Sequence, residues 1–188
     1  MNKKSTLCNK CISQFEPKFI KFKIDGIKAL TLYEYDVLMK DLIYKFKGCY
    51  DFELHSVFLE TFKNELSILF RGYKMAPAPS FHEDDRKRGY NHIVEIFKSI
   101  KLEMVDIFEK TEKFKQADQR FRDRKKIKNY IKIKENAVIP DKILLVDDIY
   151  TTGSTMKSMI SLLKERGIKD IKVLILCKTK QLEKETSD

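Results

Sequence analysis

The stretch that says most about the fold reads Ile143-Leu144-Leu145-Val146-Asp147-Asp148-Ile149-Tyr150-Thr151-Thr152-Gly153-Ser154-Thr155. Its first four residues are apolar and lie between Pro140 and Asp147, as expected for a central parallel strand buried on both faces. Two adjacent carboxylates follow, at the carboxyl edge where open α/β sheets bind their ligands. The stretch therefore predicts a buried strand that leads into a binding loop.

Four hydroxyl side chains and a glycine come next, at the start of an expected helix: Thr151, Thr152, Gly153, Ser154 and Thr155. Free backbone N–H groups and the positive end of the helix dipole favour a phosphate there. The acids before them, Asp147 and Asp148, suit vicinal sugar hydroxyls, either directly or through a hydrated magnesium ion. An ordinary strand-to-helix turn with capping hydroxyls is the alternative, but it does not require two adjacent acids. A P-loop is disfavoured because the sequence has no Gly-x-x-x-x-Gly-Lys pattern.

Apolar spacing around this stretch predicts an alternation of strands and helices. A helix from Ser154 to Arg166, capped by Thr152 or Ser154, and a strand from Ile171 to Cys177 complete a βαβ unit. Upstream we expect helices at Tyr35–Gly48, Glu53–Phe70 and Gly89–Ile100, strands at Tyr73–Pro79 and Leu102–Phe108, and a polar loop at Ser80–Arg88. The fold class is α/β, with a doubly wound, mostly parallel sheet. We expect a small N-terminal appendage at residues 1–34, the main domain at 35–180 and a flexible tail at 181–188.

Positive charge is the main feature of the composition. The formal net charge is +10, and residues 110–136 contain eleven Lys or Arg against four Asp or Glu. Such a segment attracts anions, and the interleaved aromatic residues Phe114, Phe121 and Tyr130 suit a single strand of nucleic acid. The candidate nucleic-acid contacts are Arg120, Arg122, Arg124, Lys125 and Lys126. The same segment could instead close over a bound ligand as a mobile loop, or be a solvated linker.

Hydropathy and cysteine usage indicate a cytoplasmic protein without a membrane span. No apolar run approaches the roughly 18 residues that a span needs, and no apolar segment follows the first lysines. Of the four cysteines, only Cys8 and Cys11 are spaced as a pair, which is not a secreted disulfide framework. A tetrahedral structural zinc needs four ligands. We therefore do not expect bound zinc, unless a degenerate or shared site supplies the other ligands.

Residues 143–155 resemble the thirteen-residue signature of type I phosphoribosyltransferases, and two further stretches narrow the resemblance to the ComF family. Residues 76–79, Ala-Pro-Ala-Pro, are similar to the Pro-x-Pro strand end of that family. Residues 86–91, Arg-Lys-Arg-Gly-Tyr-Asn, are similar to its Arg-x-Arg-Gly-Phe-Asn loop. The resemblance covers the chain from about residue 35 to residue 178.

This resemblance implies a role for each motif. Asp147 and Asp148 would meet the ribose 2′ and 3′ hydroxyls of phosphoribosyl pyrophosphate, and residues 151–155 would wrap its 5′-phosphate. The candidates for gripping the pyrophosphate are Arg86, Arg88 and Asn91, although a solvated basic turn is the alternative for that loop. Magnesium would be held through the ligand, and no metal ligand is assigned to the protein itself.

The sequence also departs from the family pattern. Tyr90 replaces Phe, and His92 stands where the family usually has Gln, which makes His92 the one histidine of functional interest. The family commonly carries two Cys-x-x-Cys pairs that bind zinc, whereas this chain has one. Its flexible loop is matched only loosely, by Gln116, Arg124 and Asn129.

The resemblance implies two functions of different class. ComF relatives are associated with DNA uptake during natural transformation, which implies a phosphoribosyl-binding domain that handles incoming single-stranded DNA with a competence helicase as partner. The alternative is an active transferase, in which a nitrogen nucleophile displaces pyrophosphate at the sugar C1. The sequence shows no recognisable pocket for an incoming base, and a family fold does not establish turnover. We favour the DNA-handling role.

Overall fold

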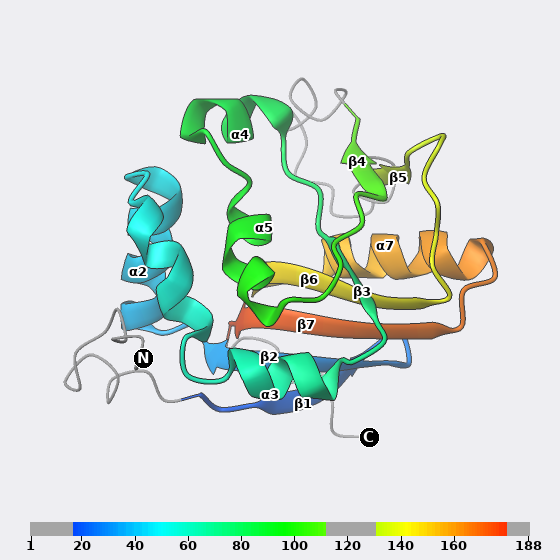
Figure 1. Cartoon of the computed structure of the whole chain (residues 1–188), viewed down its shortest axis with the longest axis horizontal. Helices are drawn as coiled ribbons and strands as arrows, with labels where there is room; N and C mark the ends of the chain where they lie inside the picture. The colour runs from blue at the N-terminus through cyan, green and yellow to red at the C-terminus, as the bar shows by residue number, and fades with distance from the viewer. Residues whose placement is uncertain (1–16, 112–130, 180–188) are drawn as a thin grey trace.

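The computed structural model describes residues 17–111 and 131–179, and its centre is a five-stranded sheet (Figure 1). The strands lie in the order β1 (Ile20–Ile24), β2 (Ile27–Glu34), β7 (Asp170–Lys178), β6 (Lys142–Tyr150) and β3 (Lys74–Pro77). Strands β2, β7, β6 and β3 run parallel, and β1 is antiparallel to β2. The expected mostly parallel α/β sheet is therefore confirmed.

Strand β6 is the buried centre of the sheet, as the apolar run predicts. The side chains of Ile143 to Val146 are fully buried between β3 and β7. The strand continues beyond this run through Asp147 and Asp148 to Tyr150. Both acids therefore lie near the end of strand β6, at the carboxyl edge of the sheet.

The β1–β2 hairpin belongs to the main sheet. Its turn, Asp25-Gly26, has φ of +47° and +82°, the left-handed pair that tight hairpins require. Strand β2 then pairs with β7 from Ala29 to Glu34. We expected residues 1–34 to form a small N-terminal appendage, but this hairpin supplies two of the five strands. Cys8 and Cys11 lie outside the described residues.

Helix α2 (Val37–Gly48) begins where we expected a helix, with Asp36 accepting a hydrogen bond from the N–H of Met39 at 2.9 Å. The prediction of a single helix at Glu53–Phe70 is wrong, because the chain forms a 3₁₀ helix, η1 (Phe52–Leu59), and then α3 (Lys63–Leu69). Around η1, the hydroxyls of Ser56 and Tyr33 donate to the carbonyls of Glu53 and Phe58. Such side-chain bonds compete with the regular helical pattern.

The prediction of a polar loop at Ser80–Arg88 is also wrong, since most of this segment is a helix, α4 (His82–Arg88). Three acids occupy its first turn and three cations its last, which complements the helix dipole. Gly89, with φ of +79°, ends it. Helix α5 (His92–Phe97) and a short 3₁₀ turn, η2 (Lys98–Ile100), follow.

The expected strand at Leu102–Phe108 is reduced to one bridge, between Met104 and Met75. A second, two-stranded sheet pairs β4 (Phe108–Lys110) with β5 (Ile131–Ile133).

Helix α7 (Ser154–Glu165) connects β6 to β7 and confirms the βαβ unit. Figure 1 shows α2, α3 and α5 grouped together, with α7 apart from them alongside β6. Within the described residues, no helix combines the length and the apolar character needed to cross a bilayer.

Candidate phosphoribosyl site

The loop after β6 encloses a cavity of about 220 Å³. Asp147 lines it from the strand, and residues 151–155 line it from the loop and the first turn of α7. Gly153 has φ of +71°, and a Cβ atom there would collide with the Tyr150 ring and hydroxyl. Only glycine therefore fits this turn, because both the backbone conformation and the space exclude a side chain.

The start of α7 has no side-chain cap among the described residues. We expected Thr152 or Ser154 to cap it, but their hydroxyls hydrogen-bond to each other at 2.8 Å instead. The first N–H groups of a helix have no partner within the helix, and they carry its positive dipole end. The turn is therefore suited to a phosphate.

Asp148 is held by the protein itself. The residue is 5% exposed, and its Oδ2 lies 2.6 Å from Lys47 Nζ and 3.3 Å from His92 Nε2. Burial opposes ionisation of this carboxyl, but the hydrogen bond from His92 and the charge of Lys47 outweigh it and hold the pKa of Asp148 well below its usual range. Asp148 is thus a carboxylate anion clamped by two elements, α2 and α5.

His92 is a buried, neutral link in this arrangement. The guanidinium of Arg88 donates to His92 Nδ1 at 3.0 Å, so that Nε2 carries the proton and faces Asp148. Burial lowers the pKa of His92, against the opposing pull of Asp148. The histidine therefore connects Arg88 to the acidic pair without adding a charge near neutral pH.

Asp147 has the opposite environment, although it is the adjacent residue. It is partly exposed, and its Oδ1 accepts a hydrogen bond from the N–H of Asp148 at 2.9 Å. Partial burial and the negative charge of Asp148 raise the pKa of Asp147 well above its usual range. Of the two acids, Asp147 is the one that the protein leaves available to a ligand.

A second cavity, of about 290 Å³, extends from the acids toward the end of β3 and α4. Both acids line it, together with Ser80 at the end of the Pro-x-Pro segment. Three cations also line it, and these are Lys47, Arg88 and Lys110. Burial lowers the pKa of Lys110, while Asp147 opposes that shift. The space beside the acids is thus suited to a second anionic group.

The comparisons with known proteins show which family the chain belongs to. Residues 91–188 match the model of the phosphoribosyl transferase domain family. The competence protein ComFC of Streptococcus pneumoniae (strain ATCC BAA-255 / R6) is 30% identical over 196 residues, which cover 93% of this chain and 89% of that protein. The chain belongs to the ComF family of phosphoribosyltransferase-domain proteins.

Other similarities are more distant. ComFC of Bacillus subtilis (strain 168) is 24% identical over 139 residues, which cover 73% of this ComF-family chain and 58% of that protein. A crystal structure of a hypoxanthine phosphoribosyltransferase from Staphylococcus aureus is 14% identical, with a TM-score of 0.45 and coverage of 73% and 70% of the two chains.

The ComF-like loop at residues 86–91 is only partly at the site. Arg88 lines the second cavity and bonds Asp85 at 3.1 Å, whereas Arg86 is exposed on α4 and lines neither cavity. Asn91 caps α5 by accepting from the N–H groups of Ile93 and Val94, each at 3.1 Å. Its amide donates to Ser80 and Asp85, at 2.9 and 3.1 Å. Asn91 thus positions the loop in this structure.

Three residues of this ComF site were not predicted from the sequence: Lys47, Ser80 and Lys110. Ser80 directly follows the Pro-x-Pro segment, and that position could have marked it. Lys47 and Lys110 come from α2 and β4, far away in the sequence, and no local pattern distinguishes them from other lysines. Arg120, Arg122, Arg124, Lys125 and Lys126 lie outside the described residues.

Proposed function

We propose that this ComF-family protein binds phosphoribosyl pyrophosphate, or a related phosphoribosyl ligand, together with magnesium. The observation that carries the proposal is that Asp147 and residues 151–155 line one cavity at the carboxyl edge of the central strand. The free helix start suits the 5′-phosphate, and the available carboxylate of Asp147 suits the ribose hydroxyls. The cations of the second cavity, Lys47, Arg88 and Lys110, suit the pyrophosphate.

The acidic residues of this site fit a magnesium ion. Carboxylate and phosphate oxygens are the ligands that this ion prefers, and Asp147 is the carboxylate that no described cation contacts in an ion pair. Bound together with the ligand, magnesium would neutralise charge on the pyrophosphate. Asp147 would hold the ion from the protein, and phosphate oxygens of the ligand would supply further ligands.

A melting experiment tests the ligand claim. Phosphoribosyl pyrophosphate with magnesium, at 100 times its Kd, should raise the melting temperature of the wild type by about 5–10 °C. Asp147→Asn should remove this rise, and Asp141→Asn, an exposed acid before β6, should keep it. No rise in the wild type would overturn the proposal.

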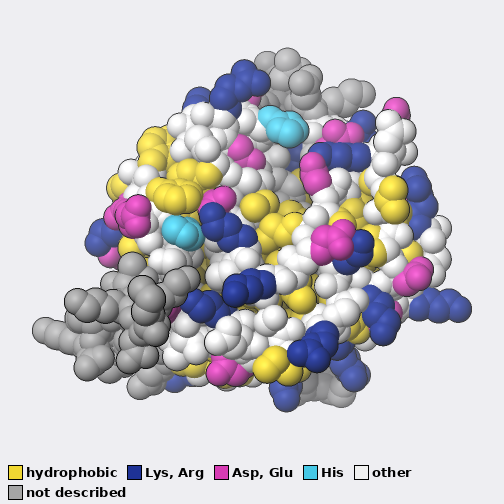
Figure 2. All heavy atoms as spheres, viewed as in Figure 1, with side chains coloured by type: hydrophobic (Ala, Val, Ile, Leu, Met, Phe, Trp, Pro, Cys, Tyr) yellow, Lys and Arg dark blue, Asp and Glu magenta, His cyan; other side chains and the backbone are white. Residues whose placement is uncertain are grey.

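We further propose that the protein acts in DNA uptake during natural transformation by handling single-stranded DNA, in concert with a competence helicase. The support is the name of the relatives, both competence proteins, and the strongly basic sequence. On the face seen in Figure 2, Lys and Arg side chains are scattered among acidic and apolar ones, with no single basic patch. Binding to a single strand should weaken steeply with salt. Binding that is absent, or that does not depend on salt, would contradict the proposed DNA-handling role.

A transferase activity is the second candidate. The observation that favours it is a groove of about 700 Å³ that could admit a nitrogen nucleophile. The groove shares four lining residues with the second cavity: Lys47, Asp84, Arg88 and Ile149. Release of pyrophosphate in the presence of a panel of nucleobases would establish it, and release at the rate of the protein-free control would exclude it for those bases.

A further inference from the structure

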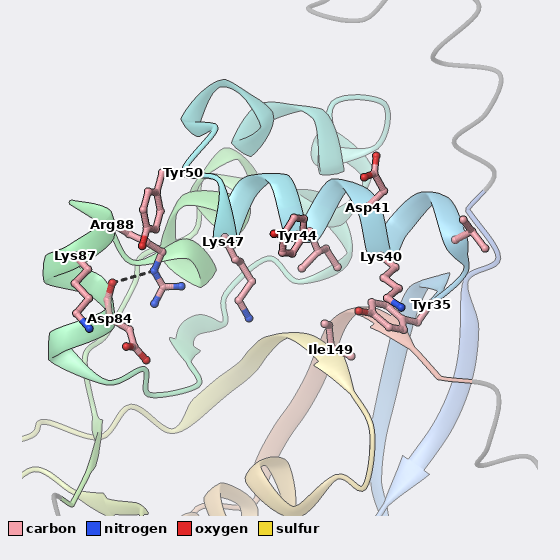
Figure 3. Close-up of a pocket in the computed structure, with 13 residues that line it drawn as sticks. Tyr35, Lys40, Asp41, Tyr44, Lys47, Tyr50, Asp84, Lys87, Arg88 and Ile149 are labelled. Carbon is pink, nitrogen blue, oxygen red and sulfur yellow. Dashed lines mark hydrogen bonds between the residues drawn. The ribbon is translucent and has the colours of Figure 1, made fainter. Parts of the chain in front are cut away.

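The groove of about 700 Å³ lies between α2 and α4, and we call it the α2–α4 groove (Figure 3). It is more than twice as large as either cavity around the acids. One side of α2 forms its wall, because Val37, Lys40, Tyr44 and Lys47 recur at spacings of three and four residues. Val37 is 86% exposed and Tyr44 65% exposed. The described residues thus leave an apolar and aromatic wall uncovered.

Tyrosines line the groove along the whole length of α2. Tyr35 precedes the helix, Tyr44 lies within it and Tyr50 follows it. A helix of 12 residues spans about 18 Å, which is longer than one base ring can cover. Tyr50 is half exposed and has φ of +59°, a conformation that bulky residues rarely adopt. The groove therefore offers a series of rings rather than one binding position.

Cations line the same groove. Lys40 and Lys87 line the groove, and among the described residues neither amine takes part in an ion pair. Lys47 and Arg88 also line it but are paired with Asp148 and Asp85. Two acids reach the groove, Asp84 and Asp41, and the latter is neutralised by Lys45 at 2.7 Å. Among the described side chains, two amines without an ion pair, Lys40 and Lys87, thus stand against one such carboxylate, Asp84, so the available charge of the groove is positive.

Aromatic rings alternating with cations are what a single strand of nucleic acid requires, since its bases stack and its phosphates need neutralising. Figure 3 shows the Lys47 side chain pointing from α2 toward the sheet, and both Lys47 and Ile149 line the groove and the second cavity. Ile149 is two residues from Asp147, so that the groove ends at the candidate site. A bound strand would therefore lie next to the phosphoribosyl ligand.

We propose that the α2–α4 groove binds single-stranded nucleic acid, with bases stacked on Tyr44 and Tyr50 and phosphates on Lys40 and Lys87. This inference rests on the DNA-handling part of the proposed function and assigns it a surface within the described residues. None of the residues that line the groove belongs to the basic segment at residues 110–136.

Fluorescence anisotropy with a labelled strand of about 12 thymidines tests the stacking. The double variant Tyr44→Ala/Tyr50→Ala should raise the Kd at least about tenfold. Tyr44→Phe/Tyr50→Phe keeps the rings and should bind like the wild type. All of these variants should keep the melting shift with phosphoribosyl pyrophosphate, because neither tyrosine lines the cavities around the acids.

The salt dependence tests the cations independently. Lys40→Gln/Lys87→Gln should reduce the slope of log K against log salt by about 1.4, because each lost phosphate contact removes about 0.7. The matched control, Lys21→Gln/Lys28→Gln, removes two exposed lysines from the β1–β2 hairpin and should leave the slope unchanged.

Each other outcome overturns the inference. If the wild type binds the strand and the alanine and glutamine variants bind equally well, the strand lies elsewhere and only the groove assignment fails. If the wild type does not bind the strand at all, both the groove assignment and the DNA-handling role are wrong. The melting shift still tests the phosphoribosyl claim independently. If thymidine monophosphate binds the groove as tightly as the strand does, the groove is a mononucleotide site.

Discussion

Asp147 and Asp148 are neighbours in the sequence with opposite electrostatic environments. Lys47 and His92 hold Asp148 as an anion, whereas Asp147 is left beside that anion without a cation of its own. The sequence predicts the pair and its place at the sheet edge, because adjacent acids after an apolar run form a local pattern. It does not predict the difference between them, because that depends on residues from α2 and α5.

This difference predicts opposite effects of two matched substitutions. The pKa of Asp147 is raised in the folded state, so its contribution to stability is present below its unfolded pKa of about 3.8 and is lost as the pH rises through the folded pKa. At pH 7, Asp147→Asn should therefore stabilise the ligand-free protein by about 1 kcal/mol. This gain should shrink as the pH approaches 4.

Asp148→Asn should do the reverse. The pKa of Asp148 is lowered on folding, so its stability contribution is present above about pH 3.8 and is lost on acidification. Asparagine would leave Lys47 and His92 without their anion and should destabilise the protein at pH 7 by about 2–3 kcal/mol. Urea unfolding at several pH values measures both variants, and the same sign for both would contradict this assignment.

Gly153 is a second position at which a single residue determines the shape of the site. Gly153→Ala would place a methyl group against Tyr150, in addition to the strain of a positive φ. Gly167 has φ of +81° but open space around it, so Gly167→Ala carries the backbone strain alone. We expect Gly153→Ala to be destabilised by about 1–3 kcal/mol more than Gly167→Ala in thermal unfolding. Equal losses would mean that the turn does not pack against Tyr150.

At the scale of elements, the βαβ unit from β6 to β7 follows from the sequence, whereas α4, η1 and the β1–β2 hairpin do not. The βαβ unit has strong local signals, an apolar run and an amphipathic helix that ends at Gly167. Helix α4 has no buried residues and is marked only by its charge order. Its polar sequence therefore predicts a loop, and only the dipole argument could have identified it.

The loop between α4 and α5 depends on a helix cap. Asn91 satisfies two N–H groups of α5 and ties Ser80 and Asp85 to the loop. Asn91→Ala should therefore cost about 1 kcal/mol of stability, and Asn91→Ser, which can still cap, should restore most of it. Calorimetric unfolding measures this loss. A stability unchanged by Asn91→Ala, with loss of ligand binding alone, would favour the direct pyrophosphate contact instead.

At the scale of the whole molecule, the sheet extends into the segment that we expected to be an appendage. Strand β2 covers the edge of β7, and Leu32 and Tyr33 are buried in the common core. Pairing between strands about 140 residues apart has no local signature, so composition alone could not reveal it.

Deleting residues 1–34 should therefore prevent folding. The deletion would remove two strands and expose the long edge of β7. Far-ultraviolet circular dichroism of the purified fragment measures this. A cooperative thermal transition in the fragment would show instead that a domain boundary lies after residue 34.

Isothermal titration of the ligand-free protein with phosphoribosyl pyrophosphate and magnesium is the most direct measurement on the site. We expect one ligand per chain in the wild type, with affinity lost in Asp147→Asn and in Gly153→Ala, and kept in Gly167→Ala. A wild type that takes up no ligand, or that binds it equally well without Asp147, would contradict the assignment of the strand edge and helix start to a phosphoribosyl group.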